Sequence, residues 1–196
     1  MNGPPHCGKD TAVKQLVPYI HFMHLKFAAP LKRMVCGLLN ISMSQLEELK
    51  DTPYPMLQLD NGSIIAEYGT IRALLIHLSE NVLKPLYGQH FFGKALWNDA
   101  RSTTEKLFLV SDSGFLPEAA YVIGKAGHKN VLQLRIHRQG CTFDGDSRSY
   151  WSHEYTPMRE IHNNMTKHDL TMRVLSAILR TWPETELLRQ PDWIKQ

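Results

Sequence analysis

Apolar positions recur along the chain with two spacings, and these spacings predict alternating strands and helices. An alternating run at 21–27 and continuous apolar runs at 106–111 and 131–136 predict buried strands, and 160–163 predicts a last short strand. Helical periodicity occupies the segments 11–17, 31–39, 44–50, 71–86, 91–100, 117–126 and 169–180. Strands that alternate with helices are typical of βαβ units, so we expect an α/β fold whose parallel sheet carries helices on both faces.

Proline and capping residues indicate where some of these elements begin. Pro30 stands where a first helical turn tolerates proline. Ser44 and Glu47 have the spacing of a capping box, which predicts Ser44 as the N-cap of the third helix. The polar, irregular stretch at about 139–157 predicts a mobile, lid-like insertion. Because no composition shift marks a boundary, we expect one domain over residues 1–196.

Composition and charge narrow the class of partner. Hydrophobic residues are 43% of the 196 and charged residues 21%, which are ordinary globular values. No run of 18 apolar residues and no signal-peptide pattern is visible, so we expect no membrane partner. A net charge of +3, evenly spread, disfavours nucleic acid and suits a small anionic substrate. Three widely separated cysteines favour a reducing, cytoplasmic compartment.

The first nine residues after Asn2 carry the strongest chemical signal. They read GPPHCGKDT, with Gly3 and Gly8 at the GxxxxGK spacing of a phosphate-binding loop. Glycines let successive backbone N–H groups point at phosphate oxygens, and the following helix presents its positive end to the same anion. Lys9 would reach the β- and γ-phosphates of ATP. The Mg²⁺-holding hydroxyl usually follows this lysine, but here Asp10 follows it and Thr11 comes next.

A buried strand should lead into such a loop, yet only Met1 and Asn2 precede Gly3. A truncated first strand would leave neighbouring strands with unpaired backbone groups, which is costly. We therefore expect that an apolar segment upstream of Met1 has been lost from the sequence.

Several further motifs follow in order, and together they carry a resemblance. They are GKDT at Gly8–Thr11, FAAPLK at Phe27–Lys32, IRALL at Ile71–Leu75, LVSDSGFLPE at Leu109–Glu118 and DGDSRSY at Asp144–Tyr150. Over roughly residues 1–180 the chain resembles the phage deoxynucleoside monophosphate kinases. The resemblance implies a P-loop NTPase three-layer fold with a lid, and transfer of the ATP γ-phosphate to a deoxynucleoside monophosphate with Mg²⁺. It also implies the host cytoplasm as the location, and such families often form dimers.

The resemblance also implies which residues hold the acceptor nucleotide. Lys32 and Arg72 match residues that contact the acceptor, and the planar fork of an arginine suits a phosphate. Phe92 matches an aromatic residue that stacks on the acceptor base. Asp112, which follows an apolar strand, would hold Mg²⁺ or the acceptor sugar, and Glu118 matches a carboxylate that contacts the nucleotide.

Two arginines near the predicted lid are the remaining catalytic candidates. Arg138 follows a strand and Arg148 lies in the lid, and the resemblance implies that both neutralise charge on the transferred phosphoryl group. Thr11 and Asp112 are the metal-ligand candidates, and Gly3, Gly8, Lys9, Asp10 and Thr11 are the ATP-binding candidates. Many relatives have an arginine at the position of Gly114, so this chain departs from them there.

Other interpretations stay open at this point. Phosphomevalonate kinases of the animal type share SGKD and a similar PLK segment, so the acceptor could be phosphomevalonate. A catalytically inactive nucleotide-binding protein is a second alternative, motivated by the short first strand and by Gly114. Structural roles are also open for single residues: Lys32 and Arg72 on a solvated helix, Phe92 in the core, Asp112 as a helix cap, and Arg148 paired with Asp144 or Asp146.

Overall fold

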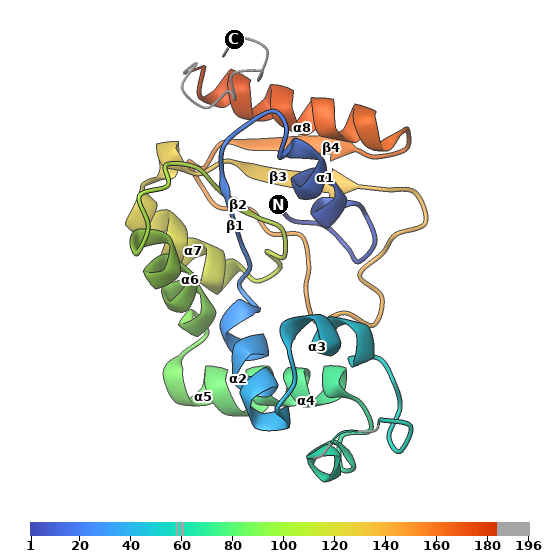
Figure 1. The fold of residues 1–196 in the computed structure, drawn as a ribbon. Helices are drawn as coiled ribbons and strands as arrows, with labels where there is room; N and C mark the ends of the chain where they lie inside the picture. Colours follow the sequence, from blue (N-terminus) through green and yellow to red (C-terminus); the bar gives the residue numbers. More distant parts are fainter. Residues whose placement is uncertain (58, 60, 184–196) are drawn as a thin grey trace, which may run out of the picture.

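The computed structural model describes residues 1–57, 59 and 61–183 (Figure 1). The helices are α1 (Lys9–Leu16), α2 (Ala29–Leu39), α3 (Met43–Leu49), α4 (Ile71–His77), α5 (Lys84–Tyr87), α6 (Phe91–Arg101), α7 (Leu116–Ala126) and α8 (Lys167–Thr181). The strands are β1 (Met23–Leu25), β2 (Phe108–Val110), β3 (Gln133–His137) and β4 (Met158–His162). Short 3₁₀ turns lie at Gly62–Ile65 and His128–Asn130, and a π-helical segment, Leu78–Leu83, joins α4 to α5.

The described strands form two parallel pairs, which confirms an α/β fold. β1 pairs with β2, and β3 pairs with β4. Between the pairs lies Asn2, which makes isolated parallel bridges to Ser113 and to Arg135. Its N–H donates to the carbonyl of Leu134 and its carbonyl accepts from the N–H of Ile136, each at 2.8 Å. One residue, rather than a strand, therefore connects the two pairs within the described part of the chain.

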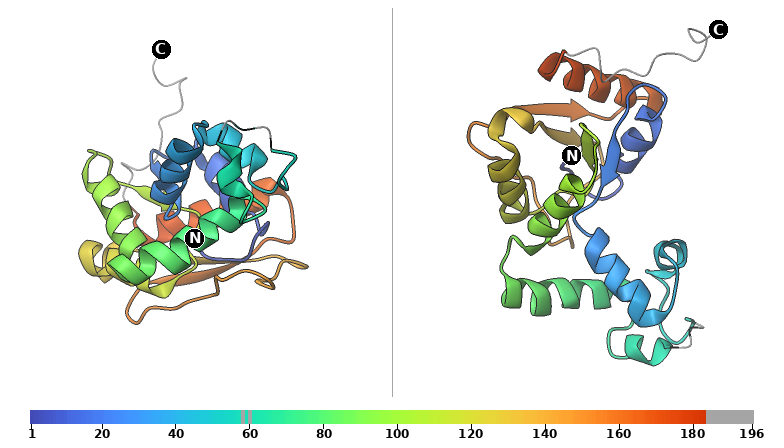
Figure 2. Two further views of the ribbon diagram at one scale, coloured as in Figure 1. Left: turned by 90° about the horizontal axis from the view of Figure 1, so that it is seen from below. Right: turned by 60° about the vertical axis from the view of Figure 1, so that its left-hand side comes forward.

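Successive residues of β2 face different sets of helices, which is what alternation along a strand dictates. Leu109 belongs to a core with apolar residues of α1, α8, β3 and β4. Phe108 and Val110 pack on a second core built from β1, α2 and α6. The short strands therefore have helices on both faces, as Figure 2 shows from two further directions.

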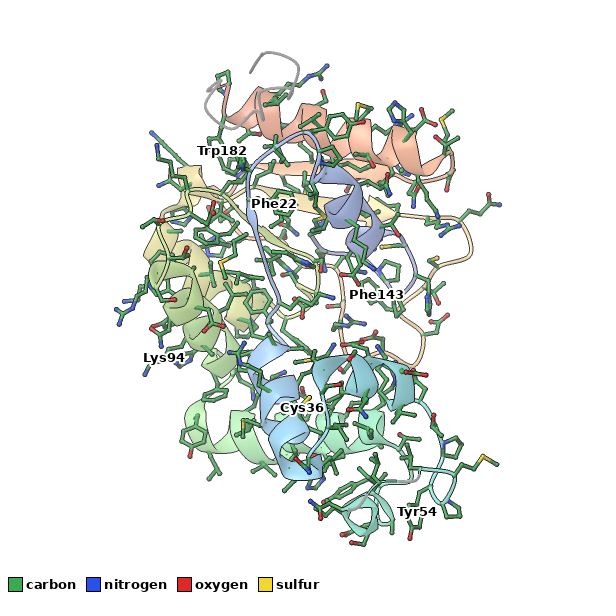
Figure 3. All side chains as sticks on the ribbon, viewed as in Figure 1. Phe22, Cys36, Tyr54, Lys94, Phe143 and Trp182 are labelled. Atoms are coloured by element: carbon green, nitrogen blue, oxygen red, sulfur yellow. The ribbon has the colours of Figure 1, made fainter. Side chains whose placement is uncertain are left out.

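A third core holds α2, α3 and α4 together away from the strands. It contains Val35, Leu46, Ile71 and Leu74, all at most 2% exposed. In Figure 1 these helices and α5 form the lower part of the molecule, and Figure 3 marks Cys36 of α2 within it. This part carries the predicted acceptor residues on α2 and α4.

The predicted N-cap of α3 was wrong by two residues. Ser42, not Ser44, caps the helix: its hydroxyl accepts from the N–H of Gln45 at 3.2 Å. The side-chain oxygen of Gln45 in turn accepts from the N–H of Ser42 at 2.8 Å, which completes a capping box. A glutamine three residues after a serine fulfils the same rule as Glu47 after Ser44, so spacing alone did not distinguish the two serines.

Among the described residues, no helix is both long enough and apolar enough to cross a membrane. The C-terminal stretch from 184, for which the sequence predicts no element, lies outside the described residues.

Candidate active site

The loop that joins Asn2 to α1 needs glycine at both ends. Gly8, the N-cap of α1, has a φ of 106°, a left-handed conformation that favours glycine. A Cβ atom on Gly8 would lie 2.5 Å from Nδ2 of Asn163, and one on Gly3 would lie 2.5 Å from the carbonyl oxygen of Ile136. The two glycines therefore let the loop fold tightly against the ends of β3 and β4.

Lys9 lies inside this loop. Its ammonium donates to the carbonyls of Gly3 and Pro4, both at 2.6 Å, and lies 3.4 Å from the Sγ atom of Cys7. The residue is 8% exposed. Burial raises the pKa of the Cys7 thiol, although the charge of Lys9 opposes that rise. The loop thus encloses one positive charge beside the positive end of α1, an arrangement that attracts an anion.

Two residues beyond the strands brace the loop from outside. Asn163, after β4, donates from Nδ2 to the carbonyl of Cys7 at 2.8 Å. Arg138, after β3, donates to the carbonyl of His6 at 3.1 Å. The sequence identified Arg138, whereas it placed Asn163 only at the end of a predicted strand and gave it no contact with the loop. Its one available signal is its position at the carboxyl end of a parallel strand, where α/β folds place functional groups.

Asp10 and Thr11 occupy the first turn of α1. Asp10 accepts from the hydroxyl of Ser111 at 2.6 Å and from the ammonium of Lys26 at 2.8 Å. Burial alone would raise the pKa of Asp10, but the hydrogen bonds from Lys26 and Ser111 lower it. Nε2 of His24 lies 2.8 Å from the same Ser111 hydroxyl. Asp10 is therefore an ionised carboxylate beside the end of β2, and Thr11 is half-buried next to it.

Asp112 holds the turn that leads into α2. Its two carboxylate oxygens accept from the N–H groups of Phe27 and Ala28 at 2.9 and 3.0 Å. This role is structural, but it is not the helix cap that the sequence left open, because both N–H groups belong to a turn far away in the chain and the N-cap of α7 is Phe115. Each oxygen retains a second lone pair, so the same carboxylate can still accept from water or coordinate a metal ion.

Arg148 lies over Gly114, close to the end of β2. A Cβ atom on Gly114 would lie 2.5 Å from the Cδ atom of Arg148, so glycine at this position makes room for the arginine. The guanidinium pairs with Asp146, with Nε at 2.8 Å from Oδ1. This hydrogen bond raises the pKa of Arg148, and the charge of Asp112 contributes in the same direction.

The end of the predicted lid is tied down. Residues 139–157, all of them described, form no helix or strand. The N–H of Ser149 donates to the carbonyl of Gly114 at 3.3 Å, and the side chain of Asn2 bonds both Ser149 and Trp151. The indole of Trp151 donates to the hydroxyl of Ser113 at 3.1 Å. Residues 149–151 are thus anchored to Asn2, Ser113 and Gly114, and the mobility of the segment stays a prediction.

The predicted acceptor residues Lys32 and Arg72 both form ion pairs. Lys32 pairs with Glu47, which also pairs with Lys50 at 2.6 Å. Burial opposes ionisation of Glu47, but the two lysines outweigh it and lower its pKa to about 2. Arg72 makes a two-pronged pair with Asp51, in which one distance is 2.8 Å. The charge of Arg72 also acts to lower the pKa of Arg148, so α4 lies close enough to the lid segment for these two charges to interact.

Phe92 and Glu118 are both buried. Phe92 is 3% exposed and belongs to the core of β1, α2 and α6, so its ring is a core ring and we leave it out of the site. Glu118 lies 3.5 Å from the ammonium of Lys84, and Lys84 is itself 2% exposed. The same ammonium pairs with Glu80 at 2.7 Å and lies over the ring of Phe115. Burial raises the pKa of Glu118 to about 7, although Lys84 opposes the rise.

A cavity of about 390 Å³ opens beside Arg138, between the ends of β3 and β4. The rings of His137 and His162 stack in its wall with centroids 5.1 Å apart, and Tyr150 lies 4.8 Å from His137. Phe143, labelled in Figure 3, meets the Tyr150 ring edge-on. The cavity thus combines flat rings with one cation.

In the described part of the chain, no group of three or more histidine, cysteine or acidic residues could hold a metal ion. No protein-family model matches the chain, and a search of curated proteins found no match.

Proposed function

We propose that this protein is an ATP-dependent kinase that transfers the γ-phosphate of ATP to a deoxynucleoside monophosphate, giving a deoxynucleoside diphosphate and ADP. The observation that carries the proposal is the buried Lys9 ammonium, enclosed by the Gly3–Gly8 loop at the start of α1. A triphosphate that entered this loop would exchange the carbonyl partners of Lys9 for phosphate oxygens, and backbone N–H groups would meet the same anion.

The arrangement of the strands supports a P-loop three-layer fold. Among the described residues, the four strands and the Asn2 bridges are all parallel, so the spatial order is β1, β2, Asn2, β3, β4. The loop then begins in the middle of this order. Ligands of open α/β sheets bind outside the carboxyl ends of such central strands.

Charged residues around the loop suit phosphoryl transfer. Arg138 contacts the loop at the carbonyl of His6, and Arg148, within the lid segment, packs over Gly114; in the proposed reaction both neutralise the charge that spreads over the transferred group. Thr11, Asp10 and Asp112 are the residues that would hold Mg²⁺, which usually takes one or two carboxylates together with phosphate oxygens and water. Bound there, Mg²⁺ would offset the negative charge of the phosphates. The acceptor phosphate is already a nucleophile, so the proposal requires no general base.

The base of ATP has a suitable place in the cavity beside Arg138. Flat side chains of His137, His162 and Tyr150 offer stacking surfaces, and the guanidinium of Arg138 adds a cation–π contact. Arg138 already touches the loop through His6, so the base and the phosphates would lie within one continuous site.

Lys32 and Arg72 are the proposed contacts for the acceptor phosphate. The fork of Arg72 holds two oxygens of the Asp51 carboxylate, and these stand in for two phosphate oxygens. The Arg72–Asp51 pair lies on exposed surface, where such pairs contribute little, so a doubly charged phosphate can displace the Asp51 carboxylate at low cost.

The decisive experiment measures ADP release with ATP, Mg²⁺ and each deoxynucleoside monophosphate in turn, with phosphomevalonate as a further acceptor. We expect acceptor-dependent release with a deoxynucleoside monophosphate. Lys9→Ala should reduce this release at least about 100-fold, as loss of an electrostatic contact to the reacting group does. Lys14→Ala, an exposed lysine on the same helix, should change it less than about twofold.

Other results would change the assignment. Release with phosphomevalonate alone would keep a kinase and replace the substrate. ATP binding without transfer to any acceptor would indicate an inactive nucleotide-binding protein, which the ion-paired state of Lys32 and Arg72 would then explain. Equal activity of Lys9→Ala and the parent protein would refute the site.

A further inference from the structure

An apolar cavity of about 620 Å³ lies between β2 and β3. Its walls come from both strands, from the residues just ahead of each, and from α6, α7 and α8; they include Leu107, Val110, Leu132, Leu134, Ile123 and Ile178. We call this cavity the strand slot.

Backbone groups of both strands point into the strand slot. The carbonyl of Leu107 accepts from the N–H of Met23 at 2.9 Å and so faces β1. Because the backbone N–H and C=O groups of successive residues point to opposite edges of a strand, those of Phe108 and Val110 point into the slot. The N–H of Gln133 donates to the carbonyl of Pro157, next to β4, so by the same rule Leu132 and Leu134 face the slot from the other side.

Within the described residues, Met1 and Asn2 are the ones that meet these edges, and they do so at one end. The N–H of Asn2 donates to Leu134, and the amine of Met1 donates to the carbonyl of Val110. Asn2 is parallel to both neighbours. A backbone traced backward from Met1 would therefore run along the slot between β2 and β3.

The amine of Met1 is chemically out of place there. Burial lowers its pKa from 8.0 to about 5, and the charge of Asp112 only partly opposes this fall. A peptide N–H in the same place would donate the same hydrogen bond to Val110 with no charge to desolvate. The local chemistry thus favours a nitrogen that is part of a peptide bond.

We propose that the strand slot is the binding site of one extended apolar segment of about five residues, parallel to β2 and β3 and joined to Met1 by a peptide bond. Such a segment would cover the apolar walls and form hydrogen bonds with the backbone groups of Phe108 and Leu132 that face the slot. The N–H of Leu134 would donate to the residue ahead of Met1. β1–β2 and β3–β4 would become one continuous sheet, whether or not the protein is a kinase.

The test extends the chain at Met1 by five residues in two forms. One form carries five β-branched apolar residues, and the matched control carries alternating glycine and serine. Both forms turn the terminal amine of Met1 into a peptide nitrogen, so a difference between them reports the filling of the slot. We expect the apolar extension to raise the urea midpoint of unfolding above that of the control, and to slow hydrogen exchange at the amide of Leu134 at least about tenfold.

Equal urea midpoints and equal exchange rates for the two extended chains would overturn the proposal. A midpoint that rises with protein concentration, together with a dimer in size-exclusion chromatography, would also overturn it. That result would mean that the extension pairs with a second copy instead of entering its own slot.

Discussion

In the loop from Gly3 to Lys9, the space available for a side chain limits which residues can stand there as much as charge does. The left-handed backbone at Gly8 and the closeness of Asn163 leave no room for a side chain, and the buried Lys9 depends on that tight curve. The same closeness holds the loop against β4 through the hydrogen bond from Asn163 to Cys7.

We predict that Gly8→Ala lowers the free energy of unfolding by about 2 kcal/mol or more. A left-handed conformation costs a non-glycine residue about 1–2 kcal/mol, and the contact with Asn163 adds to this. Gly37→Ala is the matched control, because Gly37 lies within α2 with nothing in reach of an added Cβ atom. It should raise the free energy by about 0.5–1 kcal/mol. Urea unfolding measures both, and equal effects would contradict the steric reading.

Glu118 predicts a pH dependence. Its folded pKa of about 7 lies above the ordinary value of 4.5, so between these pH values the native state binds more protons than the unfolded state. The stability that Glu118 contributes is therefore full below about pH 4.5 and is lost as the pH rises through 7.

Glu118→Gln should remove this dependence. The variant's stability relative to the parent protein should increase between pH 5 and pH 8, by up to about 3 kcal/mol. Urea unfolding at the two pH values measures it, with Glu48→Gln, on the exposed side of α3, as the control for loss of a carboxylate. A parallel pH course for Glu118→Gln and the parent protein would contradict the pKa of about 7.

Among the elements, α3 offers the sharpest comparison of sequence with structure. Ser42→Ala removes the capping hydroxyl and should cost about 1 kcal/mol of unfolding free energy. Ser44→Ala, two positions on, should cost no more than a few tenths. Thermal or urea unfolding of the pair tests the assignment, and the reverse order of effects would restore Ser44 as the cap.

Periodicity predicted where helices and strands lie, because each buries one face and the apolar spacing records that face. It missed the orientation of Lys84. At about 100° per residue, a regular helix begun at Ile71 would turn Lys84 away from the apolar face. The π-helical segment Leu78–Leu83 changes the turn per residue, marked by the N–H of Lys84 donating to Ser79, and so Lys84 points inward to Glu118.

The site residues fall into two groups: those whose placement depends on local sequence spacing, and those whose placement depends on contacts between distant parts of the chain. The tight loop from Gly3 to Lys9 was predictable because its shape depends on the local spacing of two glycines. The roles of Phe92 and Asp112 were not, because burial and the partner N–H groups of Phe27 and Ala28 come from distant parts of the chain.

For the whole molecule, Asn2 is the central connection. It is fully buried, bridges the two strand pairs, and its side chain bonds Ser113, Ser149 and Trp151. The two strand pairs and the lid segment are therefore all connected through Asn2.

Asn2→Ala should cost about 2–4 kcal/mol of unfolding free energy, because several buried polar groups lose their partners. It should also speed hydrogen exchange at the amide of Trp151, which donates to Asn2. Asn130→Ala removes an exposed amide that bonds the carbonyl of Ala126 and is the control, with an expected cost below about 1 kcal/mol. Unchanged exchange at Trp151 would show that other contacts hold the lid segment.

The packing of Arg148 over Gly114 has an evolutionary consequence. A side chain at position 114 and the arginine at position 148 compete for the same space, so a larger residue at 114 requires Arg148 to move or to be replaced. Sequences descended from a common ancestor with this chain should show the two positions changing together: a larger residue at 114 should accompany a shorter one at 148.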